Sequence, residues 1–329
     1  MRKYKRFQIP RRSMPLIATL LVFVLLYTYG GVTYRKFMTM RVFFNLLTDN
    51  AVLGITAIGM TFVIISGGID LSVGAVISTT AMMVAVLLRA GVPNFLVILI
   101  ALSFGTILGL LMGAMIEYFS TPPFIVTLAG MFFARGLGYI LNLGSVPISY
   151  PFYVKMSSLG VRLGTGKLTI PGITLLLMSI IGWYILKWTR FGRHVYALGG
   201  SEQSSILMGL PVTRTKVLVY TFSGFCSAIA GLIYTFYTLS GYGLAAMGLE
   251  MEAIASAVIG GTLMTGGYGT IWGTLLGTMI QGLLKSIIAF NGQFSVFWIK
   301  LFTGGMLLIF ILLQKVFLLS IKTKEQERV

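Results

Sequence analysis

Acidic residues are scarce in this chain, which has 8 Asp and Glu against 25 Lys and Arg in 329 residues. Charged residues of both signs make up 10% of the sequence, whereas soluble domains carry about 25%. So low a charge content excludes an ordinary soluble domain. It also leaves no regular ladder of intramembrane acids, which a proton-driven pump would need.

Cysteine and histidine are rarer still, with one of each, Cys226 and His194. Cys226 lies in an apolar segment and cannot form an internal disulfide, and His194 has no nearby Cys, Asp or second His. Residues 164–168 (GTGKL) lack the first Gly and the final Ser or Thr of a phosphate loop. We therefore expect no catalytic residue, no metal site and no cofactor bound by this chain, so any ATP must bind to another chain.

Apolar residues dominate instead, at 57% of the sequence, and the net charge is +17. This composition predicts a polytopic membrane protein. The positive charge then indicates membrane orientation, because basic residues stay on the cytoplasmic side, and we expect no nucleic-acid partner.

Ten apolar segments approach the roughly 20 residues that a membrane-spanning helix needs. The first follows six basic side chains within residues 1–12 and has no small-x-small cleavage site, so we predict a retained helix rather than a signal peptide. The predicted spans are 16–34, 51–66, 70–88, 95–118, 123–142, 172–188, 216–238, 251–266, 268–289 and 296–319.

Alternating these spans from a cytoplasmic start predicts one transmembrane domain over 16–319, with cytoplasmic tails at 1–15 and 320–329. Segment 143–171 is then periplasmic and loop 189–215 cytoplasmic. The predicted inner segments and their flanks carry fifteen basic residues against seven on the outer side, which favours this topology. The long polar loop, basic at both ends, indicates a cytoplasmic contact surface, or else a solvated loop without a partner.

Two glycine-rich breaks share the pattern Gly-Gly, five residues, Gly, one from Gly67 to Gly74 and one from Gly266 to Gly273. Gly-interrupted apolar segments in both halves of a chain indicate a transporter repeat and its binding site. Asp70, in the first break, either caps the next helix or contacts a solute.

Other residues near the predicted spans indicate how the helices pack. Gly105, Gly109 and Gly113 recur every fourth residue, as do Gly269, Gly273 and Gly277, which indicates close helix packing or glycine that is merely tolerated. Glu250 and Glu252 open a predicted helix, where the helix dipole favours acids, and Lys285 lies near a predicted helix end.

Four stretches resemble the permease subunits of bacterial ribose-type ABC sugar importers, and the likeness covers nearly the whole chain. They are Ala57–Ala75, Pro123–Leu141, Thr189–Val212 and Glu250–Gly277. Within this family the chain looks most like the second of two permease subunits of galactofuranose importers, including Leu47–Ala51.

The resemblance implies an all-α inner-membrane permease of about ten transmembrane helices, with a pseudo-repeat and a cytoplasmic coupling helix. It implies import of a monosaccharide, ATP and Mg on a partner ABC ATPase, a periplasmic sugar-binding protein, and a second, non-identical permease. The chain would then be a transport subunit and not an enzyme. An ion-coupled secondary sugar transporter is the alternative.

The resemblance also assigns site residues. Arg193 would pair with an ATPase acid or a lipid phosphate, or serve only as a positive-inside anchor. Family members often read Gly-Asn-x-x-Ala-Ala where this chain has Gly200–Ser205, which leaves the identity of the ATPase open. The expected coupling residues are Gly192, Arg193, Ala197, Gly199, Gly200, Ser201, Glu202 and Gly209, and those of the path and broken helices are Asn50, Gly67, Gly68, Asp70, Ser72, Asn142, Gly266 and Gly267.

Overall fold

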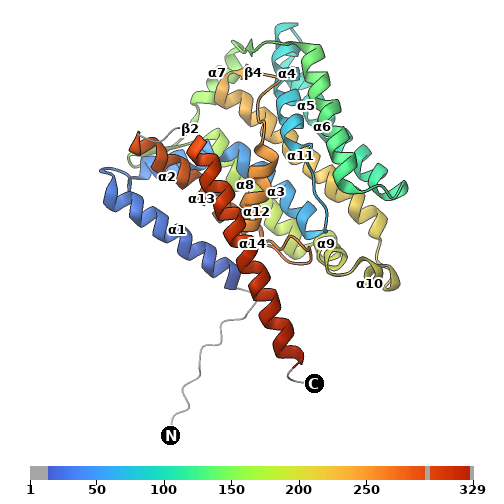
Figure 1. The fold of residues 1–329 in the computed structure, drawn as a ribbon. Coiled ribbons are helices and arrows are strands. Elements are labelled where there is room, and N and C mark those ends of the chain that lie inside the picture. Colours follow the sequence, from blue (N-terminus) through green and yellow to red (C-terminus); the bar gives the residue numbers. More distant parts are fainter. Residues whose placement is uncertain (1–13, 293–296, 327–329) are drawn as a thin grey trace.

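The computed structural model describes residues 14–292 and 297–326, which are mostly helical (Figure 1). Two short antiparallel pairs, β1 with β4 and β2 with β3, are the sheets in these residues. The helices are α1 (Met14–Thr33), α2 (Met40–Asp49), α3 (Ala51–Ile65), α4 (Val73–Arg89), α5 (Asn94–Tyr118), α6 (Pro123–Leu141), α7 (Pro151–Ser158), α8 (Ile170–Trp188), α9 (Arg190–Gly200), α10 (Glu202–Leu207), α11 (Val212–Thr238), α12 (Leu249–Ile259), α13 (Ile271–Asn291) and α14 (Phe297–Gln326), and the strands are β1 (Val146–Pro147), β2 (Gly160–Leu163), β3 (Gly166–Thr169) and β4 (Ser240–Gly241).

Every predicted span overlaps a helix, but the helices differ in length. Among the described residues, α1, α5, α6, α8, α11 and α13 are long and apolar enough to cross a membrane, and α2 with α3 makes a seventh span if their 56° bend is counted as one crossing. α12 has 11 residues and so extends about 16 Å, roughly half of the hydrocarbon thickness. The helix ends at Ile259, whereas the predicted span extended to residue 266. Ten membrane crossings therefore stay a prediction.

The centre of the molecule is α3, which is buried along nearly its whole length. A helix that is apolar on all sides, as α3 is, belongs in a protein interior. It packs against α11, α12 and α8, and the first glycine break follows its C-terminal end.

Both glycine triplets lie at close helix contacts. Gly105 and Gly109 of α5 face the carbonyl oxygens of Gly224 and Tyr220 on α11, where a side chain would overlap the backbone. On α13, Gly273 and Gly277 face the backbone of α12 in the same way. The predicted close packing is confirmed.

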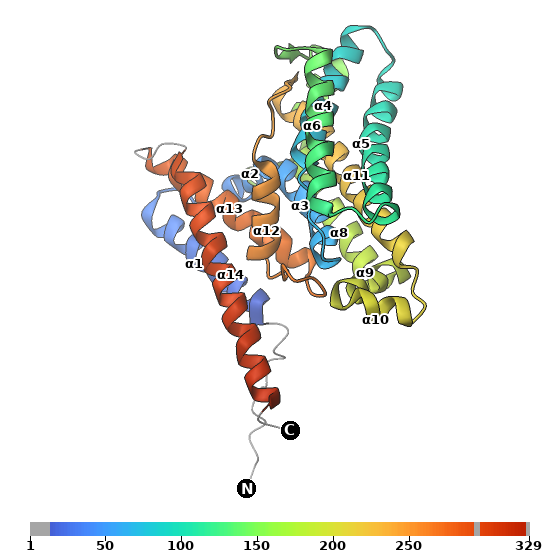
Figure 2. The same ribbon diagram turned by 45° about the vertical axis from the view of Figure 1, so that its right-hand side comes forward.

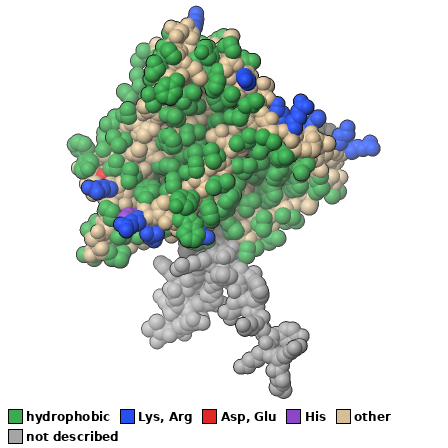
Figure 3. All heavy atoms as spheres, turned by 180° about the vertical axis from the view of Figure 1, so that it is seen from behind, with side chains coloured by type: hydrophobic (Ala, Val, Ile, Leu, Met, Phe, Trp, Pro, Cys, Tyr) green, Lys and Arg blue, Asp and Glu red, His purple; other side chains and the backbone are tan. Residues whose placement is uncertain are grey.

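The outer surface carries many large apolar side chains on α5, α6 and α8. Figure 3 shows one such face, where hydrophobic side chains cover the middle and Lys and Arg lie toward its margins. This distribution suits a lipid-facing belt with basic residues near the headgroups.

Candidate coupling and transport site

Helix α9 folds back against the end of α8 because of two small residues. Thr189 caps α9, with its Oγ1 accepting from the Gly192 nitrogen at 3.1 Å. Gly192 lies directly on the carbonyl oxygens of Ile185 and Leu186, where a side chain has no room. The start of α9 is therefore held by the preceding transmembrane helix.

The end of α9 meets the second glycine break and the end of α3, just before the first break, at one point. The Gly267 nitrogen donates to the Ile65 carbonyl oxygen at 2.8 Å, which joins the end of α3 to the segment between α12 and α13. Gly199 packs on both groups, and a methyl group there would overlap the Ile65 oxygen. Gly266 and Gly267 have φ of +84° and +74°, which favours glycine. We call Ile65, Gly199, Gly266 and Gly267 the glycine junction.

Tyr196 adds a side-chain bond beside the glycine junction. Its hydroxyl donates to the Gly269 carbonyl oxygen at 2.7 Å. Burial, with a smaller contribution from Tyr268, raises the pKa of Tyr196 to about 12. The hydroxyl therefore remains a donor at every physiological pH.

Tyr196→Phe should weaken coupling without preventing assembly, because it removes one hydrogen bond of about 1 kcal/mol. Import by the assembled transporter should fall several-fold. The hydrogen bond is fully present below the ordinary tyrosine pKa of 10 and is lost only as pH rises through about 12. The range from pH 6 to 8 lies about two units below the pH at which this loss begins. The ratio of variant to wild-type import should therefore stay constant over that range. A ratio that changes over this range would contradict the assignment.

The first break is held by Asp70, which is fully buried. Its Oδ1 accepts from the Ser72 nitrogen at 2.9 Å and from the Ser72 hydroxyl at 2.6 Å, and its Oδ2 accepts from Ser223 on α11 at 2.8 Å. Ser72 is the residue just before α4, so Asp70 stabilises the turn that leads into the helix and does not bond the helix's own amides, as the capping interpretation required. Both carboxylate oxygens have protein donors, which favours a structural role over direct solute contact. Gly67 turns the chain with φ of +87°, and Gly68 packs on the Tyr220 hydroxyl.

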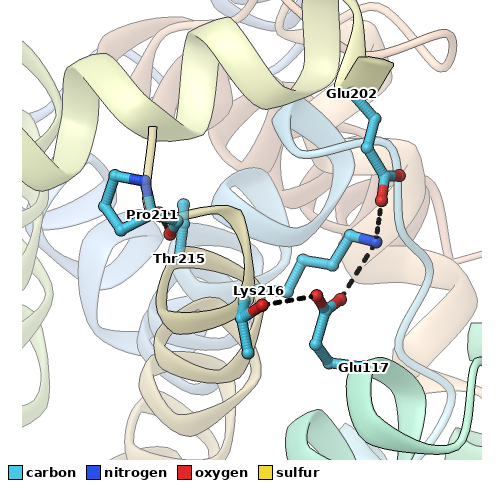
Figure 4. Close-up of polar contacts among 6 residues, drawn as sticks. Glu117, Glu202, Pro211, Thr215 and Lys216 are labelled. Carbon is cyan, nitrogen blue, oxygen red and sulfur yellow. Dashed lines mark hydrogen bonds and ion pairs between the residues drawn. The ribbon is translucent and has the colours of Figure 1, made fainter. Parts of the chain in front are cut away.

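Helix α10 is tied to the membrane helices by an ion-pair cluster (Figure 4). Lys216 Nζ, on α11, lies 2.5 Å from Glu202 Oε1 on α10 and 3.1 Å from Glu117 Oε2 on α5. Thr213 Oγ1 also donates to Glu117 Oε1 at 2.9 Å. The cluster joins α10 and α11, which follow each other in the chain, to the distant helix α5.

Lys216→Met should loosen α10, because partly exposed ion pairs each contribute up to about 1 kcal/mol and this change removes two. Limited proteolysis should cleave the 201–211 segment several-fold faster than in wild type. Arg214→Met is the matched control, since Arg214 is exposed and the described residues offer it no ion pair. Equal cleavage of the two variants would contradict a tethering role.

The predicted coupling residues thus separate into two groups. Gly192 and Gly199 pack toward the membrane helices, and Ala197 is partly buried. The others are exposed: Arg193, Gly200, Ser201, Glu202 and Gly209. Next to them Ile206, Leu207 and Met208 expose apolar side chains that the sequence analysis did not single out.

The predicted path residues do not form one cluster. Asp70 and Ser72 bond to each other, whereas Asn50 donates to the Leu46 carbonyl at the α2–α3 bend. Asn142 accepts from the Gly144 nitrogen in a turn after α6. Sequence reasoning assigned no role to Ser223, Tyr196 or Glu117, because a single polar residue in a helix carries no signal of which neighbouring segment it faces.

Comparison with known proteins agrees with this geometry. Residues 42–312 match the family described as the permease component of the branched-chain amino acid transport system. The chain is 46% identical over 307 residues to the inner membrane ABC transporter permease protein YjfF of Escherichia coli, covering 93% of each chain. It is 37% identical over 320 residues to the fructose import permease FruG of Bifidobacterium longum, covering 94% of this chain and 93% of that one. It is 38% identical over 286 residues to the ribose import permease RbsC of Haemophilus influenzae, covering 86% of each. No solved structure matches the chain significantly.

The multi-helix fold and these matches define a membrane permease. The chain belongs to the family of ABC-transporter permease components, within the sugar-importer class. It is a multi-pass inner-membrane protein and a transport subunit rather than an enzyme. Permeases of this class work with a separate ATPase and a periplasmic binding protein.

Proposed function

We propose that this chain forms half of a heterodimeric pore that imports a monosaccharide, galactofuranose, from the periplasm. The likeness to the second permease of galactofuranose importers, which includes Leu47–Ala51, supports this sugar. ATP and Mg bind to the partner ATPase, which docks on α9 and α10 from the cytoplasm. The proposal also includes ten membrane crossings, cytoplasmic termini, and a pseudo-repeat formed by the two glycine breaks.

The observation that carries this proposal is the glycine junction. The exposed part of the α9–α10 segment is available to a cytoplasmic partner, while Gly199 touches the backbone of Ile65 at the end of α3 and of Gly267 in the second break. A movement of α9 would therefore reach the end of α3 and the segment between α12 and α13 without passing through flexible side chains. Direct backbone contacts of this kind allow the membrane helices to switch between two packed arrangements when α9 moves.

Docking would use the apolar side chains of Ile206, Leu207 and Met208, which are exposed at the end of α10. Exposed apolar side chains in a cytoplasmic loop are typical of a partner surface. Ion-coupled transport would leave this surface without a role.

Co-purification in mild detergent tests the proposal. The tagged chain should recover an ATPase and a second permease, and Leu207→Glu should lose the ATPase while it keeps the permease. In proteoliposomes with the binding protein, labelled galactofuranose should enter only with ATP inside. A chain that purifies alone and imports sugar by an ion gradient would overturn the proposal.

A further inference from the structure

Helix α12 begins inside the membrane domain, beside the start of α4. The chain before it follows α4 inward, since Gly241 lies on the Ala81 carbonyl oxygen and the Ala246 oxygen lies against Gly74. The break after α12 reaches the glycine junction, and α12 itself extends about 16 Å. Its first turn is therefore near the middle of a hydrocarbon layer of about 30 Å.

Glu250 lies in this first turn and points to the start of α4. Its carboxylate lies against Gly74, and its Oε2 is buried with no hydrogen-bond partner among the described residues. The N-terminal ends of α12 and α4 both favour a negative charge at this place. A carboxylate oxygen is thus held in place but left without a donor.

More polar groups lie around Glu252, two residues after Glu250, where α12 meets α13. Lys285 Nζ lies 2.7 Å from Glu252 Oε2, rather than extending to a membrane surface as its place near a helix end suggested. Gln281 is fully buried, and its Nε2 donates to the Glu252 carbonyl and the Ser256 hydroxyl, both at 2.9 Å. Gln281 Oε1 has no partner among the described residues.

The described residues leave this end of α12 partly exposed. Glu252 and Lys285 side chains are 29% and 37% exposed, and Met247 and Met251 beside them are 62% and 56% exposed. Figure 2 shows α12 between α14 on one side and α4 with α6 on the other. Partly exposed charges at this depth are costly against lipid, and irregular backbone is tolerated only against protein or water.

We propose that Glu250, on the α4 side of α12, and Glu252, Gln281 and Lys285, on its α13 side, together line a solute-binding site on the translocation path, for a neutral polyhydroxylated solute. This inference rests on the proposed function and assigns the path residues that it needs. Sugar hydroxyls both donate and accept, so they match the free oxygens of Glu250 and Gln281 and the Lys285 ammonium. The carboxylates repel anionic solutes, and a site of few polar groups binds weakly enough to release.

Cysteine accessibility provides the first test. In a Cys226→Ser background of the complete transporter, Met247→Cys and Glu250→Cys should react with a membrane-impermeant methanethiosulfonate reagent. Ile107→Cys, on the exposed apolar face of α5, is the lipid-facing control and should not react. Unreactive cysteines at 247 and 250 would assign this face to contact with the second permease and overturn the inference.

Uptake provides the second test, with labelled galactofuranose, ribose and fructose as probes. Glu250→Gln and Lys285→Met should lower import of the transported sugar about tenfold or more, the effect of losing one hydrogen bond to a charged group. Stimulation of ATP hydrolysis by loaded binding protein should stay within about twofold, because the glycine junction is unchanged. Lys300→Met, at an exposed site on α14, is the matched control and should import normally.

A charge exchange separates solute binding from a purely structural ion pair. The double variant Glu252→Lys with Lys285→Glu keeps an ion pair between these two positions. A purely structural role of the pair predicts that import is restored. A binding site predicts that import stays low although the complex assembles. Wild-type import by Glu250→Gln, or full restoration by the exchange, would overturn the site. If the wild-type complex itself neither imports sugar nor hydrolyses ATP, the proposed function has failed instead.

Discussion

Gly199→Ala should reduce sugar import to background while the assembled complex still forms. The added methyl group overlaps the Ile65 carbonyl oxygen and approaches the Gly267 nitrogen, so the hydrogen bond between them cannot remain. All three groups are backbone, and none can turn away as a side chain would. Overpacking of this kind costs about 1–3 kcal/mol, here concentrated on the contact that joins α9 to the end of α3 and to the second break.

Import and ATP hydrolysis should be measured together in proteoliposomes, with co-purification as the assembly control. Gly136→Ala on α6 is the control variant, because Gly136 lies outside the α9–α10 segment and nothing lies within 4 Å of a methyl group at that glycine. We expect Gly136→Ala to import at close to the wild-type rate. If the two alanine variants behave alike, the glycine junction does not carry coupling.

Asp70→Ala should destabilise the protein by about 2–3 kcal/mol or more, because each buried donor left unsatisfied costs about 1–3 kcal/mol. The donors are the Ser72 nitrogen, the Ser72 hydroxyl and the Ser223 hydroxyl. Without them the 66–72 segment is no longer fixed to α11. We expect low yields and a lower unfolding temperature in detergent.

Asp70→Asn distinguishes hydrogen bonding from charge. The amide oxygen can still accept from Ser72, and the amide nitrogen can donate to the Ser223 oxygen, so this variant should keep most of the stability and import. Thermal unfolding and import should both be measured. A stable Asp70→Asn protein without import would show that the charge itself serves transport, which contradicts the structural assignment.

The glycine breaks illustrate how far pattern reasoning reaches. The Gly-Gly spacing located both interruptions, and the turns at Gly67, Gly266 and Gly267 have the positive φ that favours glycine there. The pattern did not show that the second break touches the end of α3, nor that Gly199 lies on both. Contacts between backbones 68 to 202 positions apart leave no periodic trace in a single sequence, as the Gly199–Gly267 and Ile65–Gly267 pairs show.

The charged residues show the same division. Glu250 and Glu252 were correctly predicted in the first turn of a helix, because the helix dipole is a local property. The pairing of Glu252 with Lys285, and of Lys216 with both Glu117 and Glu202, depends on which helices are neighbours. Span length failed at α12 because hydropathy averages over a turn that Gly260 and Gly261 make inside an apolar stretch.

The sequence by itself determined the class of protein: a chain of apolar helices with few acids, no catalytic motif, and a polar central loop that resembles a permease coupling segment. These are local properties of composition and spacing. Only the tertiary structure decided which glycines join the loop to the membrane helices and which polar side chains share one face. Helices in a bundle meet through packing of distant segments, and that packing is a property of the whole chain.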